Sequence, residues 1–181
     1  MIIHRFVLPG LVLASVLLSL VYGVPALAAS NETEVRATVE RVFQELKSKN
    51  YDALYENLPA SSRTRLSRER FTTSLRRTQD TYALDRLEIG KVKASGNIAT
   101  VDTVFYGRLL KPFETEGKIV AQQYLVREDG KWKVATGDNA TIRRFLAANP
   151  AFARQFPIRA PRVFVKKDGG WMEFTMPKRP R

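Results

Sequence analysis

Residues 124–138 read YLVREDGKWKVATGD, and this stretch predicts a β-hairpin on which the rest of the chain packs. Asp129-Gly130 favours a two-residue turn, because glycine tolerates the positive φ that such turns need. Alternation along the second strand predicts one face of Trp132, Val134 and Thr136 opposite another of Lys131, Lys133 and Ala135. This pattern is typical of an antiparallel sheet with one side buried.

The strand before the turn has apolar residues on both of its faces. One face holds Val120, Gln122, Tyr124 and Val126, and the other holds Ile119, Ala121, Gln123 and Leu125. Because neither face is consistently polar, we expect this strand to be covered on both sides.

The composition indicates a globular protein without the usual catalytic side chains. The 181 residues are 44% hydrophobic and 27% charged, which suits one domain of moderate size and an extension. There is no cysteine, and the single histidine, His4, lies in the N-terminal apolar segment. Thiolate and imidazole chemistry and the common zinc sites are therefore excluded from the remainder of the chain. We expect neither a metal nor a cofactor.

The positive charge is concentrated at the C-terminal end. Of the formal net charge of +12, residues 139–181 contribute +8, with 10 Lys and Arg against 2 Asp and Glu. Residues 29–138 are nearly balanced, with 19 against 16. The basic character is therefore mainly a property of the C-terminal extension.

Residues 1–28 have the pattern of a secretory signal peptide. Arg5 precedes the apolar run of residues 11–20, and residues 25–28 read PALA, an Ala-x-Ala type of cleavage site. We expect cleavage near Ala28, with Ala29 as the alternative, and export to the periplasm or the medium. An uncleaved membrane anchor over residues 6–24 is the competing interpretation.

Helical patterns come first in the remaining chain. A helix is expected from Thr33 to Lys49, capped by Asn31 and ended at Asn50. A short helix over residues 51–58, a polar linker over residues 60–66 and a helix capped by Ser67 follow. The apolar positions of the first helix favour a core role over a pocket role.

From Tyr82 the period changes to two. Strands are expected over residues 82–94 and 98–109, followed by a loop and the hairpin. Three helices followed by four antiparallel strands predict an α+β domain with the helices on one side of the sheet.

These elements resemble the nuclear transport factor 2-like superfamily, and in particular its exported bacterial domains of unknown function. The resemblance covers Thr33 to Asp138 and depends on residues 49–55 (KNYDALY), the Ser67-capped helix and residues 129–134 (DGKWKV). It implies a cystatin-like cone, in which a curved antiparallel sheet wraps around the first helices and leaves a pocket at its open end. Members include ketosteroid-isomerase-like and polyketide-cyclase-like (SnoaL-like) enzymes and also non-catalytic binding and dimerisation modules, so the fold alone does not select a function.

A non-catalytic module that binds a small hydrophobic ligand or another protein is the function we expect. The residues expected to contact such a ligand are aromatic: Phe43, Tyr55, Phe105, Tyr124 and Trp132. The resemblance also implies a homodimer.

The enzymatic alternative is a histidine-free isomerase or cyclase. Asp102 and Tyr106 share a strand face and are its candidate acid/base pair, since a pocket carboxylate and a tyrosine can move a proton. A solvent-facing Asp102 beside tyrosines that only pack is the interpretation we favour.

Residues 139–181 form the extension. A helix is expected through Ala148, capped by Asp138 or Asn139, then a turn after Asn149-Pro150. A linker leads to a second hairpin around Asp168-Gly169, and residues 177–181 are expected to be disordered.

The second hairpin mixes cations with aromatic residues. Arg162, Lys166 and Lys167 are its candidate anion-binding residues, and an anionic envelope surface is a candidate partner. Nucleic acid is disfavoured by the expected export. The alternative is a solubilising basic surface whose aromatic residues pack back onto the domain.

Overall fold

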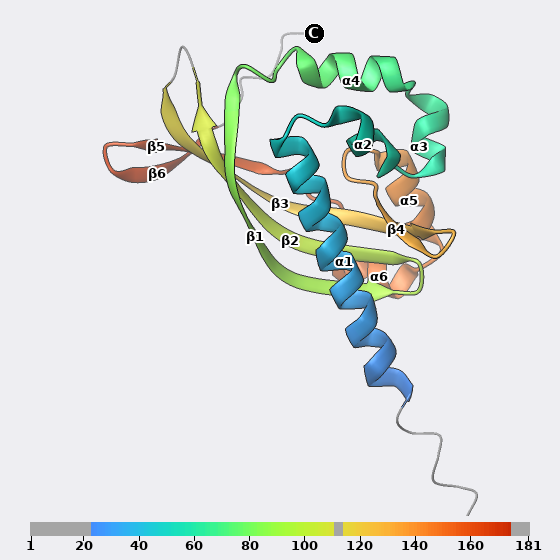
Figure 1. Ribbon diagram of the computed structural model, residues 1–181. Helices are drawn as coiled ribbons and strands as arrows, with labels where there is room; N and C mark the ends of the chain where they lie inside the picture. Colours follow the sequence, from blue (N-terminus) through green and yellow to red (C-terminus); the bar gives the residue numbers. More distant parts are fainter. Residues whose placement is uncertain (1–22, 111–113, 175–181) are drawn as a thin grey trace, which may run out of the picture.

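The computed structural model describes residues 23–110 and 114–174, an α+β arrangement of helices around one sheet (Figure 1). The first helices are α1 (Gly23–Lys47), α2 (Tyr51–Glu56), α3 (Ala60–Arg65) and α4 (Arg68–Arg76). Strands β1 (Tyr82–Ser95), β2 (Ile98–Leu109), β3 (Thr115–Glu128) and β4 (Lys131–Val134) follow. The chain continues with α5 (Asn139–Ala147), α6 (Pro150–Gln155), β5 (Arg162–Lys167) and β6 (Gly170–Phe174). The expected α+β class is confirmed.

All six strands belong to one curved antiparallel sheet. Its order is β1-β2-β3-β5-β6, and β4 also pairs with β3. β4 pairs with residues 125–128 of β3, whereas β5 pairs with residues 117–120 of the same strand. The extension therefore does not end in a separate appendage, because its hairpin continues the main sheet.

The two expected hairpin turns are present. Glu128 pairs with Lys131 across the first turn, and Lys167 pairs with Gly170 across the second. In both turns the Asp and the Gly have positive φ, with 49° and 73° at residues 129 and 130 and 50° and 81° at residues 168 and 169. Positive φ at both central residues is the property of the turn type that matches strand twist.

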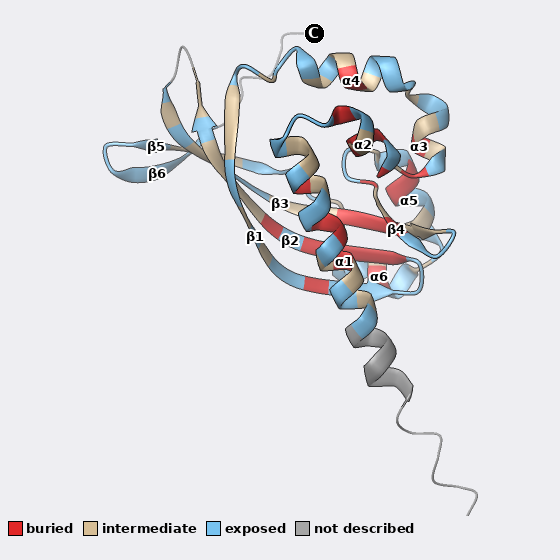
Figure 2. Ribbon diagram, in the orientation of Figure 1, coloured by how far each residue is buried: buried red, intermediate tan, exposed pale blue. Residues whose placement is uncertain are grey.

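The sheet carries a separate apolar core on each face (Figure 2). Leu125 of β3 packs with Val35 and Val39 of α1, whereas its neighbours Tyr124 and Val126 belong to a second core. That second core contains residues of α5 and α6: Ile142, Leu146 and Phe152. The expectation that β3 is covered on both sides is confirmed, but the helices do not all lie on one side of the sheet.

The ends of α1 differ from those expected. The helix begins at Gly23 rather than near Thr33, and Asn31 lies within it, where its Oδ1 accepts a hydrogen bond from Arg127 Nη1 at 2.9 Å. At the other end Lys49, with φ of 59°, takes the left-handed conformation that was expected of Asn50. Asn50 instead caps α2 by accepting from the Ala53 amide at 3.3 Å.

The segment expected to be a polar linker forms α3. The Glu128 carboxylate of β3 accepts a hydrogen bond from the Ala60 amide at 2.7 Å and so stabilises its first turn. Ser62 of the same helix donates to Asp138 at 2.6 Å. These partners are 68 and 76 residues away in the chain, which is why local sequence did not indicate a helix. Ser67 caps α4, as expected, by accepting from the Arg70 amide.

Some expectations lie outside the described residues. Residues 1–22 of the expected signal peptide are outside them, and so are residues 111–113 and the expected disordered end at residues 177–181. Within the described part of the chain, no helix is both long enough and apolar enough to span a membrane.

Candidate functional site

A mainly apolar cavity of about 270 Å³ lies between the N-terminal helices and the sheet. Helices α1, α2 and α4 supply one part of its wall, and β2, β3 and the chain from β4 onwards supply the other. The lining residues are Val39, Val42, Phe43, Leu46, Leu54, Asn57, Leu58, Phe71, Leu75, Phe105, Gln123, Val134 and Thr136. Its size is close to the lower end of small-molecule pockets.

Two of the five expected ligand-binding aromatic residues line this cavity. Phe43 of α1 and Phe105 of β2 have ring centroids 6.0 Å apart, with the planes tilted by 45°. Phe43 is almost fully buried, at 2% exposure, and Phe105 is half-buried. The α1 residues that sequence alone assigned to the core therefore also supply the cavity wall.

Tyr55 does not line the cavity but packs against one of its lining residues. Its ring packs on Phe71 at 5.7 Å between centroids, and Phe71 lines the cavity. The Tyr55 hydroxyl lies 2.9 Å from the Leu66 carbonyl oxygen and 3.2 Å from that of Arg63. Its hydrogen-bonding capacity is thus used in fixing the turn between α3 and α4.

Trp132 lies on the expected face but outside this cavity. Its side chain, 3% exposed, packs with Val35 and Val39 in the core beneath α1. Val134 and Thr136, which share its strand face, line the cavity as the alternation predicts.

Tyr124, expected to contact a ligand, lies on the opposite face of the sheet and does not line this cavity. It is 2% exposed in the core formed with α5 and α6. Its hydroxyl lies 2.7 Å from the carbonyl oxygen of Phe156, and burial raises the pKa of the phenol. Because both faces of β3 are apolar, alternation alone did not show which face meets α1.

The polar groups of the cavity wall are neutral amides and a hydroxyl. Gln123 Nε2 donates to Thr103 at 3.3 Å, and Thr136 Oγ1 accepts from the Tyr124 amide at 2.9 Å. The Asn57 amide donates to Glu45 at 2.6 Å. Burial raises the pKa of Glu45, against the opposing effects of Arg41 and Asn57.

The candidate acid/base pair does not face the cavity. Asp102 is exposed and lies across β2 from the cavity residue Phe105, because side chains alternate along a strand. Tyr106 is on the same outer face, where its hydroxyl donates to Glu88 at 3.0 Å and the Arg86 guanidinium lies 3.6 Å from its ring centroid. Hydrogen bonds from Arg86 and Tyr106 lower the pKa of Glu88.

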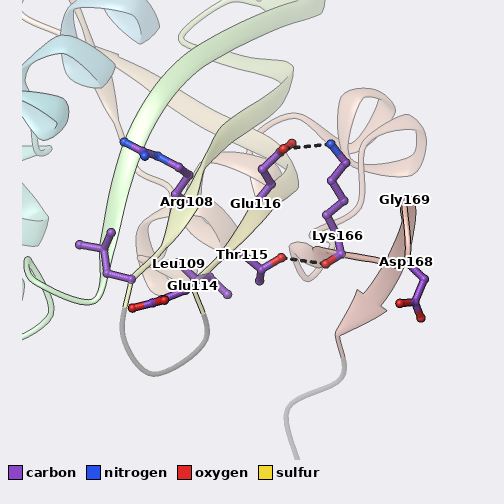
Figure 3. Close-up of a pocket in the computed structure, with 9 residues that line it drawn as sticks. Arg108, Leu109, Glu114, Thr115, Glu116, Lys166, Asp168 and Gly169 are labelled. Carbon is purple, nitrogen blue, oxygen red and sulfur yellow. Dashed lines mark hydrogen bonds and ion pairs between the residues drawn. The ribbon is translucent and has the colours of Figure 1, made fainter.

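Two of the three candidate anion-binding residues are ion-paired. Arg162 forms a two-point contact with Glu173, at 2.9 and 2.6 Å, which raises the pKa of the arginine and lowers that of the glutamate. Lys166 Nζ lies 2.9 Å from Glu116, beside a hollow between β2, β3 and the second turn (Figure 3). Lys167 is exposed and has no ion pair with another residue of the described ranges.

Two aromatic residues of the second hairpin, Phe164 and Trp171, contact side chains of the neighbouring strands, although Trp171 and Phe174 remain exposed. Lys118 of β3 lies 5.3 Å from the Phe164 ring centroid and 4.5 Å from that of Trp171. Trp171 also meets Tyr106 edge-on at 6.4 Å. The contacts of Phe164 and Trp171 agree in part with the alternative of a solubilising basic surface whose aromatic residues pack back onto the domain.

The other residues that line the cavity, which were not proposed as ligand contacts, come from α1, from α2, α4 and the chain after α2, and from β3, β4 and the chain that follows β4. Among them, Leu54, Leu58, Phe71 and Leu75 are apolar residues of the helices expected over residues 51–58 and after Ser67. Gln123 was not singled out, although it shares a strand face with Leu125. The position of Gln123 on the same strand face as the core residue Leu125 could have indicated that Gln123 faces α1.

Comparison of the chain with protein-family models and with curated proteins gives no match. Among the described residues, no group of three or more His, Cys, Asp and Glu is placed to hold a metal ion.

Proposed function

We propose that this protein is an exported, non-catalytic binding domain of the nuclear transport factor 2-like type, which holds a small apolar ligand in the cavity of about 270 Å³. The single observation that carries the proposal is the chemistry of the cavity wall. Ten of the thirteen lining residues named above are aliphatic or Phe, and none is ionisable. Such a wall favours burial of apolar surface over proton transfer.

The arrangement of the elements supports a cystatin-like cone. The sheet is curved, and α1 contacts β1, β2 and β4 on the face that bears the cavity. Phe105 of β2 and Gln123 of β3 meet Phe43 of α1 at the cavity, and α4 supplies Phe71 and Leu75. The position of the cavity between α1 and the sheet supports the pocket that the family resemblance implies.

The alternatives have less support. An isomerase would need an acid/base group inside the cavity, whereas Asp102 and Tyr106 are on the outer face. Binding of an anionic surface through the second hairpin would compete with the ion pairs that Arg162 and Lys166 already make, which leaves Lys167 as the one candidate cation of the three that is unpaired within the described ranges.

Binding is tested with an uncharged fluorescent probe, N-phenyl-1-naphthylamine. We expect a saturable rise in fluorescence with the purified protein. Val42→Phe, which adds volume to the cavity wall, should weaken binding by about tenfold, equivalent to about 1.4 kcal/mol. Val165→Phe is the matched control, since Val165 lies on β5 and does not line the cavity. Equal weakening by both variants, or a signal that does not saturate, would contradict the proposal.

The absence of catalysis is tested with solvent-deuterium exchange next to the carbonyl of a ketone. We expect no exchange above the buffer rate. Exchange that Asp102→Asn abolishes would show that the isomerase alternative is correct.

Export is tested by the intact mass of the protein recovered outside the cytoplasm. The expected mass lacks residues 1–28. A mass that retains them would indicate the uncleaved anchor.

A further inference from the structure

A second depression, of about 490 Å³, lies on the other side of α1 and is distinct from the apolar cavity. It is lined by Glu34, Ala37, Thr38 and Arg41 of α1, Glu56 and Asn57 at the end of α2, and Gly130, Lys131, Trp132 and Lys133 at the first hairpin. We call it the α1–β4 groove. The only lining residue that it shares with the cavity is Asn57.

The carboxylates of the groove are already neutralised. Glu34 accepts from Arg127 Nη2 at 3.0 Å, and Glu56 accepts from Arg63 Nη1 at 2.9 Å and also contacts Arg68. Each therefore has a guanidinium partner that is not itself one of the residues lining the groove. Glu34 and Glu56 are thus shared with cations outside the groove lining, although Glu56 also attracts Lys133.

The three cations of the groove are not in direct ion pairs among the described residues, although Glu45 attracts Arg41 and Glu56 attracts Lys133 at longer range. Arg41, Lys131 and Lys133 form no ion pair with any other described residue. Arg41 donates to the neutral Asn57 Oδ1 at 3.2 Å, and Lys133 donates to the Glu56 carbonyl oxygen at 2.7 Å. The groove lining thus holds three cations against two carboxylates, and both carboxylates form ion pairs with arginines outside the lining.

The environment of Lys133 shows how closely these charges gather. The pKa of Lys133 is lowered, mainly by burial and also by the positive charges of Arg63, Lys131 and Arg41. The Glu56 carboxylate acts in the opposite direction and raises it. A bound anion would relieve the repulsion among these groups.

Two buried N–H groups near the groove also lack an acceptor. Trp132 Nε1 and Arg63 Nε are buried and have no hydrogen-bond partner within the described part of the chain. Buried donors are nearly always paired with protein, water or an ion, so an unpaired one needs an explanation. Trp132 lines the groove, and Arg63 belongs to the group of charges that acts on Lys133.

We propose that the α1–β4 groove binds an oxyanion, the phosphate or carboxylate group of a small molecule, through Arg41, Lys131 and Lys133. Guanidinium and ammonium groups are the usual partners of such oxyanions, and their hydrogen bonds to them are charge-assisted. This site does not depend on a ligand in the apolar cavity.

The chain offers an internal reporter for the test. Its two tryptophans are Trp132, which lines the groove, and Trp171, which lies on β6 at 40% exposure. We would titrate the purified ¹⁵N-labelled protein with inorganic phosphate and with acetate, replacing sodium chloride to keep the ionic strength constant. A saturable shift of the Trp132 indole N–H with at least one of the two anions, while Trp171 stays still, is the expected result.

Charge-removing variants assign the site. Arg41→Gln and Lys131→Gln should each weaken anion binding by about fivefold or more. Lys167→Gln removes the same charge from the second hairpin and should leave binding unchanged. Lys131 is exposed on a hairpin, so its variant keeps the test valid if Arg41→Gln does not fold. An unmoved Trp132 signal with both anions, or equal weakening by Lys167→Gln, would overturn the proposal.

Discussion

Arg127 of β3 joins the sheet to α1 through Glu34, with Nη2 and Oε2 3.0 Å apart. The same guanidinium donates to Asn31 at 2.9 Å and lies 5.6 Å from the Trp132 ring centroid. It therefore connects the hairpin on which the fold is based with the helix that covers it. The two partners are 93 residues apart in the chain, so this contact exists only in the folded protein.

Arg127→Ala should lower the free energy of unfolding by about 1–2 kcal/mol, because it removes charge-assisted hydrogen bonds and a ring contact that are only partly exposed. Urea unfolding followed by circular dichroism measures the change. Arg143→Ala, on the exposed side of α5, is the control and should stay within about 0.5 kcal/mol of the wild type. Similar losses in both variants would mean that Arg127 acts only through its general charge.

Because of Asp138, the stability of the fold should depend on pH in the acidic range. Burial tends to raise the pKa of its carboxyl group, but hydrogen bonds from Ser62 and Thr141 and the positive charge of Arg65 outweigh this and lower the pKa to about 2. Because the folded pKa lies below the unfolded value of 3.8, the carboxylate stabilises the fold above about pH 4. This contribution is lost as the pH falls from 4 towards 2.

Asp138→Asn should therefore remove about 1 kcal/mol of stability at pH 6 and flatten the pH dependence between 2 and 4, after allowance for solvent screening. Asparagine can still cap α5, so the variant isolates the charge. Urea unfolding at a series of pH values measures the effect. Asp102→Asn, at an exposed carboxylate, should keep the wild-type profile, and an unchanged profile in Asp138→Asn would show that this carboxylate does not contribute.

Gly107 permits close approach of β1 and β2. A Cβ at this position would lie 2.3 Å from the Ala83 carbonyl oxygen. Because this oxygen belongs to the backbone, the clash can be relieved only if the backbone of β1 or β2 shifts. Gly107→Ala should thus destabilise the protein by about 2 kcal/mol. Its direct cross-strand partner Gly117 has no contact shorter than 3.6 Å for the added Cβ. Gly117→Ala should be nearly neutral in urea unfolding, and equal losses would contradict the steric explanation.

Substitution of Tyr124 tests whether this residue stabilises the core or contacts the ligand. Tyr124→Phe removes the hydrogen bond to the Phe156 carbonyl at 2.7 Å and should cost about 1 kcal/mol of stability. Because the side chain faces α5 and α6, binding of N-phenyl-1-naphthylamine should not change. Phe105→Ala, which alters the cavity wall, should change probe affinity. Weaker probe binding in Tyr124→Phe would place the ligand on the other face.

Sequence patterns predicted the elements whose causes are local. Alternation defined β1 and β2, the Asp-Gly pairs defined both turns, and Ser67 marked the start of α4. They did not predict α3, because its first-turn amide is satisfied by Glu128 from a distant strand. Nor did they assign the faces of β3, since a strand apolar on both sides has no period that distinguishes one helix layer from the other.

For the candidate site, the sequence indicated which residue types line the cavity, but it did not show which individual aromatic residues reach it. Phe43 and Phe105 reach the cavity, whereas Tyr124 is equally aromatic and lies behind the sheet. The cations proposed from the tail were chosen by local charge density, yet the partners that neutralise them, Glu116 and Glu173, become neighbours only through strand pairing. Register is a property of the whole sheet and is not visible in a short charge run.

The second hairpin should prove to be part of the fold rather than a removable tail. β5 forms four cross-strand pairs with β3, from Gly117 with Val165 to Val120 with Arg162. Deleting residues 157–181 would leave that half of β3 as an open edge and remove the ring contacts made by Lys118. The truncated protein should therefore lose at least about 2 kcal/mol of stability and aggregate more readily. The triple variant Arg162→Gln, Lys166→Gln and Lys167→Gln keeps the backbone pairing and should lose much less stability than the truncated protein, as expected for exposed ion pairs. Urea unfolding and light scattering of both proteins decide the matter, and a truncated protein as stable as the full chain would show that the β3–β5 pairing contributes nothing.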